Sequence, residues 1–132
     1  MPNPRPNLSC RYFRHSTETI IWAAKNEKSK HFFNYEKMKE INAGKQMKSV
    51  WNIPAPGSAE KIFGKHPTQK PLELLNRILL ASTKPNDMVL DPFAGSSTTG
   101  VACVLQGRRF VGCELEQDFI DLSIERLKMA IQ

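Results

Sequence analysis

Short apolar runs bounded by polar or turn residues mark three segments of the chain as buried strands. They lie at residues 19–23, 88–90 and 110–113. Runs of this length without strict alternation are typical of strands that are covered on both faces, as in a parallel sheet between helices. A doubly wound sheet normally needs more strands to cover its helical layers. The pattern therefore predicts a partial α/β sheet that something else completes.

Apolar residues at helical spacing separate and follow these runs. Pro71 suits the first position of a helix, whose predicted apolar face consists of Leu72, Leu75 and Leu79. A second helix is expected from Thr98 to a stop at Gly107. A third is expected over residues 117–131, with a stripe that we expect to face the core: Ile120, Ile124, Leu127 and Ile131.

The turn between the strand at 88–90 and the helix at Thr98 carries the most informative chemistry. Asp91 ends the strand, and small residues at 94–97 let a ligand approach the backbone. The N–H groups at the start of the helix lie at its electropositive end. The next strand ends at Glu114, 23 positions after Asp91, where a carboxylate can accept the hydroxyls of a ribose. This order favours an adenosine cofactor.

Three interpretations of residues 91–114 compete. In a βαβ unit without a ligand, two acids would lose hydration and no stabilising contact would compensate for the loss. A nucleotide phosphate loop fails because Val101 and Ala102 replace the lysine and hydroxyl residue that hold phosphate and magnesium. A dinucleotide fingerprint fails because Ser97 replaces its second glycine and Asp91 would face a pyrophosphate. An acid there suits a cofactor with a cationic end, such as S-adenosylmethionine.

Two blocks of sequence resemble motifs of one enzyme family. Residues 91–100 read D-P-F-A-G-S-S-T-T-G and are similar to the D-P-F-x-G-S-G-T-T of the β-class amino-group DNA methyltransferases, which modify adenine N6 or cytosine N4. Residues 66–71, H-P-T-Q-K-P, match the block that precedes it in that family. The resemblance, weaker upstream at 2–7 and 18–23, implies a single Rossmann-like S-adenosylmethionine-dependent domain over 1–132. A basic target-recognition segment would be inserted at 25–62, and the cofactor-binding segment would span 63–132.

The resemblance also implies roles for individual residues. Lys70 and Asp91 would lie near the methionine end of the cofactor and Glu114 on its ribose, while Asp118 and Phe119 would border the adenine. Ser97 departs from the family glycine, and at a positive φ a serine would cost about 1–2 kcal/mol. The expected cofactor-binding residues are Thr68, Gln69, Lys70, Asp91, Pro92, Phe93, Ala94, Gly95, Ser96, Thr98, Glu114 and Leu115.

The catalytic tetrapeptide of the family, Asp, Asn or Ser followed by Pro-Pro and an aromatic residue, does not occur in the sequence. No catalytic residue is therefore expected. The resemblance implies the cofactor- and DNA-binding C-terminal part of a site-specific DNA methyltransferase, with adenine N6 favoured. Family-like sequence directly after Met1 suggests a split or truncated reading frame. A catalytic-half polypeptide or a second copy would complete the sheet, and a cognate restriction endonuclease is a further candidate partner. The alternative is a non-catalytic remnant that binds DNA or protein.

Positive charge concentrates in one tract of the chain. The net charge is +6, and residues 25–65 hold nine lysines against four glutamates. Interleaved aromatic residues suit a nucleic-acid backbone, and the absence of arginine favours backbone contacts over guanine readout. A solvated lysine-rich face is the alternative. The expected contacts to double-stranded DNA are Lys28, Lys30, Lys37, Lys39, Lys45, Gln46 and Lys48.

Cysteine and histidine positions give no metal pattern. Cys10, Cys103 and Cys113 are odd in number and lack ligand spacing. Cys103 and Cys113 fall where small buried apolar residues are expected, and the three histidines are scattered. No signal peptide and no apolar run of membrane-spanning length is present. We therefore expect a cytoplasmic location, no metal and no membrane contact.

Overall fold

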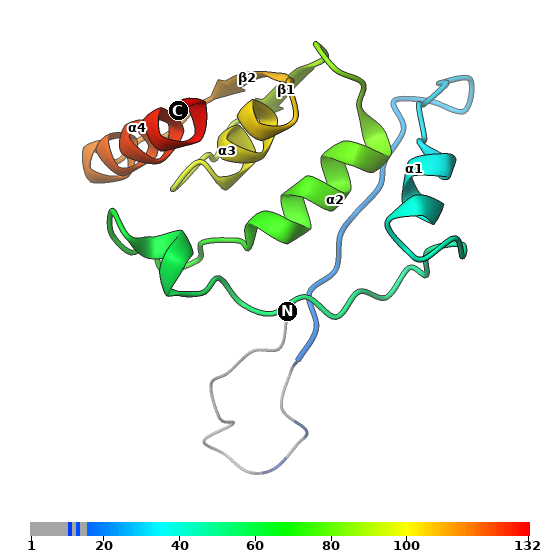
Figure 1. Cartoon of the computed structure of the whole chain (residues 1–132), viewed down its shortest axis with the longest axis horizontal. Helices are drawn as coiled ribbons and strands as arrows, with labels where there is room; N and C mark the ends of the chain where they lie inside the picture. Colours follow the sequence, from blue (N-terminus) through cyan, green and yellow to red (C-terminus); the bar gives the residue numbers. More distant parts are fainter. Residues whose placement is uncertain (1–10, 12, 14–15) are drawn as a thin grey trace.

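The computed structural model describes residues 11, 13 and 16–132. Its elements, in chain order, are α1 (Tyr35–Glu40), the short 3-10 helix η1 (Ser58–Lys61), α2 (Leu72–Ser82), β1 (Met88–Asp91), α3 (Thr98–Leu105), β2 (Arg109–Gly112) and α4 (Gln117–Ile131). Helix α2 lies between α1 and α3, and α4 packs on the other side of α3 (Figure 1). The helices that follow α1 thus form a layer next to the strands.

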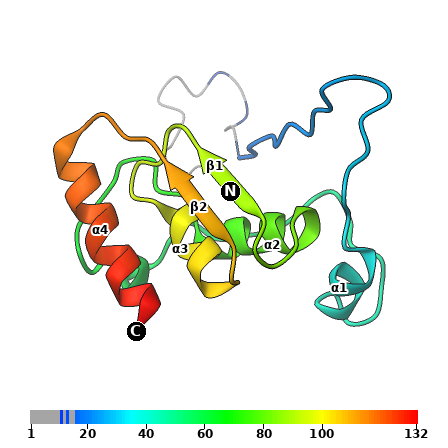
Figure 2. The same cartoon turned by 90° about the horizontal axis from the view of Figure 1, so that it is seen from above.

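The sheet of the described residues consists of two parallel strands. β1 pairs with β2 so that Val89 lies opposite Phe110 and Leu90 lies opposite Val111. Val89 and Phe110 pack on the helical layer together with a core made by Leu79, Ala102 and Cys103. Figure 2 shows both strands lying across α3, with α1 and α4 at opposite ends of the molecule. The α/β architecture expected from the sequence is confirmed.

The second face of the sheet is open to solvent in this chain. Side chains of a strand alternate between its faces, so Leu90 and Val111 point away from the core residues Val89 and Phe110. Leu90 is 64% exposed, and Met88 and Val111 are also exposed. The prediction that these strands are buried on both faces is therefore wrong. An apolar run indicates that both faces of a strand tend to be covered. It does not indicate whether this chain or another polypeptide covers them.

The predicted strand at residues 19–23 is also wrong. The segment has no regular secondary structure, and Ile21 and Trp22 are exposed. A strand forms only where a neighbour satisfies its backbone groups, and this segment pairs with neither β1 nor β2. The other upstream family-like segment, residues 2–7, lies outside the described residues.

The predicted helices are confirmed, but the buried face of α4 is not the predicted one. Pro71 immediately precedes α2, and Gly107 follows α3 with a φ of +67°. In α4 the buried residues are Leu122, Ser123 and Arg126. Of the expected stripe, Ile124 and Ile131 are exposed, whereas Ile120 and Leu127 are half-buried. Helix α4 packs toward the start of α3 through polar side chains, which hydrophobic periodicity cannot indicate.

The thiols differ in environment. Cys103 is fully buried, as predicted, whereas the prediction of a buried Cys113 is wrong, because this residue lies just after β2 and is exposed. Cys10 and His15 lie outside the described residues. Among residues 16–132 no three His, Cys, Asp or Glu side chains gather into a candidate metal site. In the same part of the chain, no helix combines the length and hydrophobicity needed to cross a bilayer.

Candidate functional site

The loop from β1 to α3 contains two residues in the left-handed region. Gly95 has a φ of +53°, and Ser97 has a φ of +55° and a ψ of 40°. Ser97 is 1% exposed, so its side chain is enclosed by protein. An L-residue in this region is disfavoured by about 1–2 kcal/mol. The backbone strain that the sequence predicted for a serine at this position is therefore present.

Glu114 joins this loop to the end of β2. Its Oε2 atom accepts a hydrogen bond from the N–H of Gly95 at 2.7 Å. Its Oε1 atom accepts from the N–H groups of Leu115 at 2.7 Å and Glu116 at 3.1 Å. The amides of Glu116 and Leu115 stabilise the ionised form most, which holds the pKa of Glu114 below its ordinary value.

These three amides limit what Glu114 can still bind. A carboxylate offers about four acceptor positions, so about one remains for a further donor. The sequence predicted that this carboxylate accepts both hydroxyls of a ribose. The geometry leaves room for one of them.

Asp91 is tied to the other end of the same loop. Its Oδ1 atom accepts from the N–H of Phe93 at 3.1 Å, and its Oδ2 atom accepts from the hydroxyl of Thr99 at 2.6 Å. Phe93 and Leu115, which follow Asp91 and Glu114 closely in the chain, are 88% and 90% exposed. The ends of both strands therefore combine an acid with an exposed apolar side chain, which suits a ligand with a flat ring and polar substituents.

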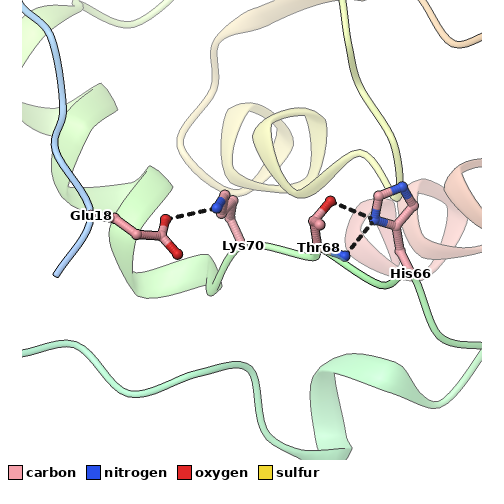
Figure 3. Close-up of polar contacts among 4 residues, drawn as sticks. All are labelled: Glu18, His66, Thr68 and Lys70. Atoms are coloured by element: carbon pink, nitrogen blue, oxygen red, sulfur yellow. Dashed lines mark hydrogen bonds and ion pairs between the residues drawn. The ribbon is translucent and has the colours of Figure 1, made fainter. Parts of the chain in front are cut away.

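The block at residues 66–71 points its side chains in different directions (Figure 3). Lys70 forms an ion pair with Glu18, with 2.7 Å between Nζ and Oε2, and this bond lowers the pKa of Glu18. The N–H of Thr68 donates to Nδ1 of His66 at 3.3 Å. Thr68 and Lys70 are exposed, whereas Gln69 points into the protein. That residue is buried, and its Nε2 atom donates to the carbonyl of Glu60 at 2.8 Å.

His66 of this block contacts the loop from β1 to α3. A Cβ atom built on Gly95 would lie 3.0 Å from His66 Nε2, so the imidazole packs directly against the glycine. The ring also meets Phe119 of α4 edge-on, at 4.2 Å between centroids. A side chain larger than that of glycine at position 95 would displace this histidine.

Sequence reasoning missed three polar groups that hold the loop. They are Thr99, which donates to Asp91, and the α4 residues Ser123 and Arg126, which donate to Gly95 and Ser96 of the loop. The available signal was a polar pair three positions apart inside an otherwise amphipathic helix. Nothing in that spacing identifies the partner.

The expected DNA-contact residues, at positions 28–48, lie around α1 and not beside this loop (Figure 1). Lys28, Lys30, Lys45, Gln46 and Lys48 are exposed, whereas Lys37 and Lys39 are half-buried on α1. The latter two form ion pairs within the helix, Lys37 with Glu40 at 2.7 Å and Lys39 with Glu36 at 3.9 Å. Helix α1 lies on the side of α2 that faces away from α3 (Figure 1). The two groups of predicted site residues thus occupy separate parts of the chain.

Two aromatic residues of the tract contact cations outside it. The Trp51 ring lies 5.0 Å from the guanidinium carbon of Arg77 on α2, and the Phe32 ring lies 4.9 Å from Nζ of Lys84. Both contacts attach the tract to α2 and to the loop that follows it.

A parallel βαβ unit with a glycine turn and an acid at the end of each strand is an arrangement with which many α/β proteins bind nucleosides. Comparison with known proteins identifies the family. The family model for DNA methylases that modify N6 or N4 amino groups matches residues 1–125. The chain belongs to this DNA methylase family, which confirms the resemblance of its motifs.

Individual relatives agree with this assignment. The chain is 58% identical over 125 residues to the type II methyltransferase M2.MboI of Moraxella bovis, covering 95% of this chain and 46% of that protein. It is 58% identical over 127 residues to M2.DpnII of Streptococcus pneumoniae, covering 96% and 47%. The crystal structure of the M1.HpyAVI–SAM complex aligns with a TM-score of 0.59 and 38% identity, over 76% of this chain and 45% of that one. The chain thus spans about half the length of the curated relatives it matches.

Proposed function

We propose that this chain is the cofactor- and DNA-binding part of an S-adenosylmethionine-dependent, site-specific DNA methyltransferase that modifies adenine N6. The observation that carries the proposal is the 2.7 Å hydrogen bond between the N–H of Gly95 and Glu114, which links the glycine turn to the acid of the neighbouring strand. Membership of the DNA methylase family supports the reaction class. A related structure contains SAM.

The residues at the strand ends fit this cofactor. Asp91 would face its cationic methionine end, Glu114 would accept a ribose hydroxyl, and the exposed Phe93 and Leu115 would contact the adenine. When bound, S-adenosylmethionine supplies an activated methyl group on a sulfonium. We assign cofactor binding to the segment 63–132, through Thr68, Gln69, Lys70, Asp91, Pro92, Phe93, Ala94, Gly95, Ser96, Thr98, Glu114 and Leu115.

The segment 25–62 would contact DNA. Its exposed lysines suit a phosphate backbone, and binding of this kind weakens steeply as salt rises. Methylation of an amino group inside a duplex requires the base to be flipped out. A catalytic-half polypeptide would have to supply the group that holds that base, because this sequence lacks the tetrapeptide. A second copy of the chain lacks it too and would complete only the sheet. A cognate restriction endonuclease remains a prediction from the resemblance, and a cytoplasmic location remains a prediction from the absence of a signal peptide and of a membrane-length apolar run in the sequence.

Reconstitution tests the proposal. The chain is mixed with the N-terminal half of M2.DpnII, radiolabelled S-adenosylmethionine and duplex DNA, and label at adenine N6 is measured. We expect methylation that needs both polypeptides and that Glu114→Ala reduces at least tenfold at limiting cofactor. If the mixture shows no methylation while the chain alone binds DNA, the chain is better described as a non-catalytic remnant.

A further inference from the structure

Helix α4 reaches the cofactor loop with two buried polar side chains. Ser123 and Arg126 are three positions apart and therefore share one face of the helix. Arg126 is only 8% exposed. Burial of an arginine in a small domain requires compensation, and the source of that compensation is the loop itself.

Hydrogen bonds from these side chains hold consecutive loop residues. The hydroxyl of Ser123 donates to the carbonyl oxygen of Gly95 at 2.8 Å. Nη1 of Arg126 donates to the carbonyl oxygen of Ser96, to Ser96 Oγ at 2.9 Å and to Thr98 Oγ1 at 3.1 Å. The C=O and N–H of a trans peptide point in opposite directions. A Gly95 carbonyl that faces α4 therefore directs the N–H of Ser96 away from α4.

The buried charge of Arg126 depends on the loop conformation for its hydrogen bonds. Desolvation lowers the pKa of this guanidinium, and the carboxylate of Glu60 acts in the opposite direction. A buried charge is tolerated where hydrogen bonds replace its lost hydration. The oxygen atoms of Ser96 and Thr98 provide these bonds, so a loop that left its present conformation would leave the guanidinium without them.

The loop conformation is one that needs external support. Gly95 and Ser97, on either side of Ser96, both have positive φ values. A non-glycine residue in this region persists only where its surroundings over-determine it. Ser97 N–H donates to the Ala94 carbonyl at 2.7 Å within the loop, and α4 adds contacts from a separate element.

We propose that Ser123 and Arg126 are positioning residues that hold the glycine turn in its cofactor-binding conformation. This inference rests on the proposed function, because that function gives the turn a cofactor to receive. Arg126 acts through the oxygen atoms of Ser96 and Thr98. It positions the backbone that would contact the cofactor and does not touch the reacting atoms.

Titration calorimetry with S-adenosylmethionine on the whole chain tests the proposal. Arg126→Met should weaken binding at least tenfold in folded protein, and Arg126→Lys should recover part of the loss because an ammonium can restore some of the bonds. Arg77→Met is the matched control, since Arg77 is a partly buried helical arginine paired with Glu73 at 2.7 Å on α2. Its affinity should stay within twofold of wild type. The same result for folded Arg126→Met would overturn the proposal.

Hydrogen exchange separates this inference from the proposed function. In Arg126→Met the Ser97 amide should exchange at least tenfold faster, while amides of α2 keep their rates. This readout needs no cofactor, so it tests the positioning role even if the wild-type chain binds no S-adenosylmethionine. A uniform increase across α2, α3 and α4 would indicate a merely structural role and would overturn the proposal.

A second-site variant gives an independent check of the coupling. Ser97→Gly should restore part of the binding or protection lost in Arg126→Met, because glycine adopts a positive φ with less need of external support. Losses that are independent of the residue at position 97 would contradict a role for Arg126 in holding this turn.

Discussion

Replacing Ser97 by glycine should stabilise the protein. Ser97 has a φ of +55° and is almost fully buried. Relief of the left-handed conformation is worth about 1–2 kcal/mol, and the extra backbone freedom that glycine has in the unfolded chain costs about 0.5–1 kcal/mol. The expected net gain is about 0.5–1 kcal/mol, which for a chain of this size corresponds to a melting temperature higher by about 2–4 °C.

Thermal unfolding followed by circular dichroism measures this gain. Ser96→Gly is the matched control, because Ser96 is equally buried but does not have a positive φ, and its hydroxyl accepts from Arg126. That variant should melt below wild type. If the loop keeps this conformation when it binds S-adenosylmethionine, the relief in Ser97→Gly is equal in the free and bound states, and the affinity should stay within twofold of wild type. A melting temperature of Ser97→Gly at or below that of wild type would refute the strain at this position.

Three further experiments test other parts of the structure. Gly112→Ala should destabilise by about 1–3 kcal/mol in urea unfolding, because its Cβ would lie 2.6 Å from the Phe110 ring; an unchanged midpoint would contradict that packing. Titration of thiols with Ellman's reagent should lose one fast-reacting group in Cys113→Ser and none in Cys103→Ser, since Cys103 is buried and burial raises the pKa of its thiol. The folded pKa of Glu114 lies below the ordinary 4.5, so its stabilisation is present above pH 4.5 and is lost as the pH falls through the folded pKa. The difference in melting temperature between wild type and Glu114→Gln should therefore shrink below pH 4.5, and a constant difference would show that the carboxylate charge is not involved.

The sequence predicted those parts of the fold that depend on local chemistry. The bounds of α2, α3 and α4 and the strands on either side of Gly95 follow from helical spacing, short apolar runs and turn residues. The glycine turn and the acid at position 114 were predicted as one site, and a hydrogen bond joins them. Both features arise within a single βαβ unit, where segments close in sequence are also close in space.

Features that depend on distant partners were not predictable from the pattern. The run at residues 19–23 has strand composition but pairs with neither β1 nor β2. The isoleucines of α4 form a stripe at helical spacing, yet Ser123 and Arg126 face the interior because their hydrogen-bond acceptors lie in the loop before α3. Hydrophobic periodicity locates the apolar face of a helix. It does not indicate that a polar side chain will be buried because hydrogen-bond acceptors lie next to it in the fold.

Calorimetric titration of the purified chain with S-adenosylmethionine tests the central claim most directly. Asp91→Ala, verified as folded by circular dichroism, is the control, because it removes the acid that ties Phe93 and Thr99 to the loop. We expect saturable binding at one molecule per chain and an affinity at least tenfold lower in Asp91→Ala. A folded wild-type chain that gives no saturable heat, or a variant that binds as tightly as wild type, would contradict the assignment of this loop as the cofactor site.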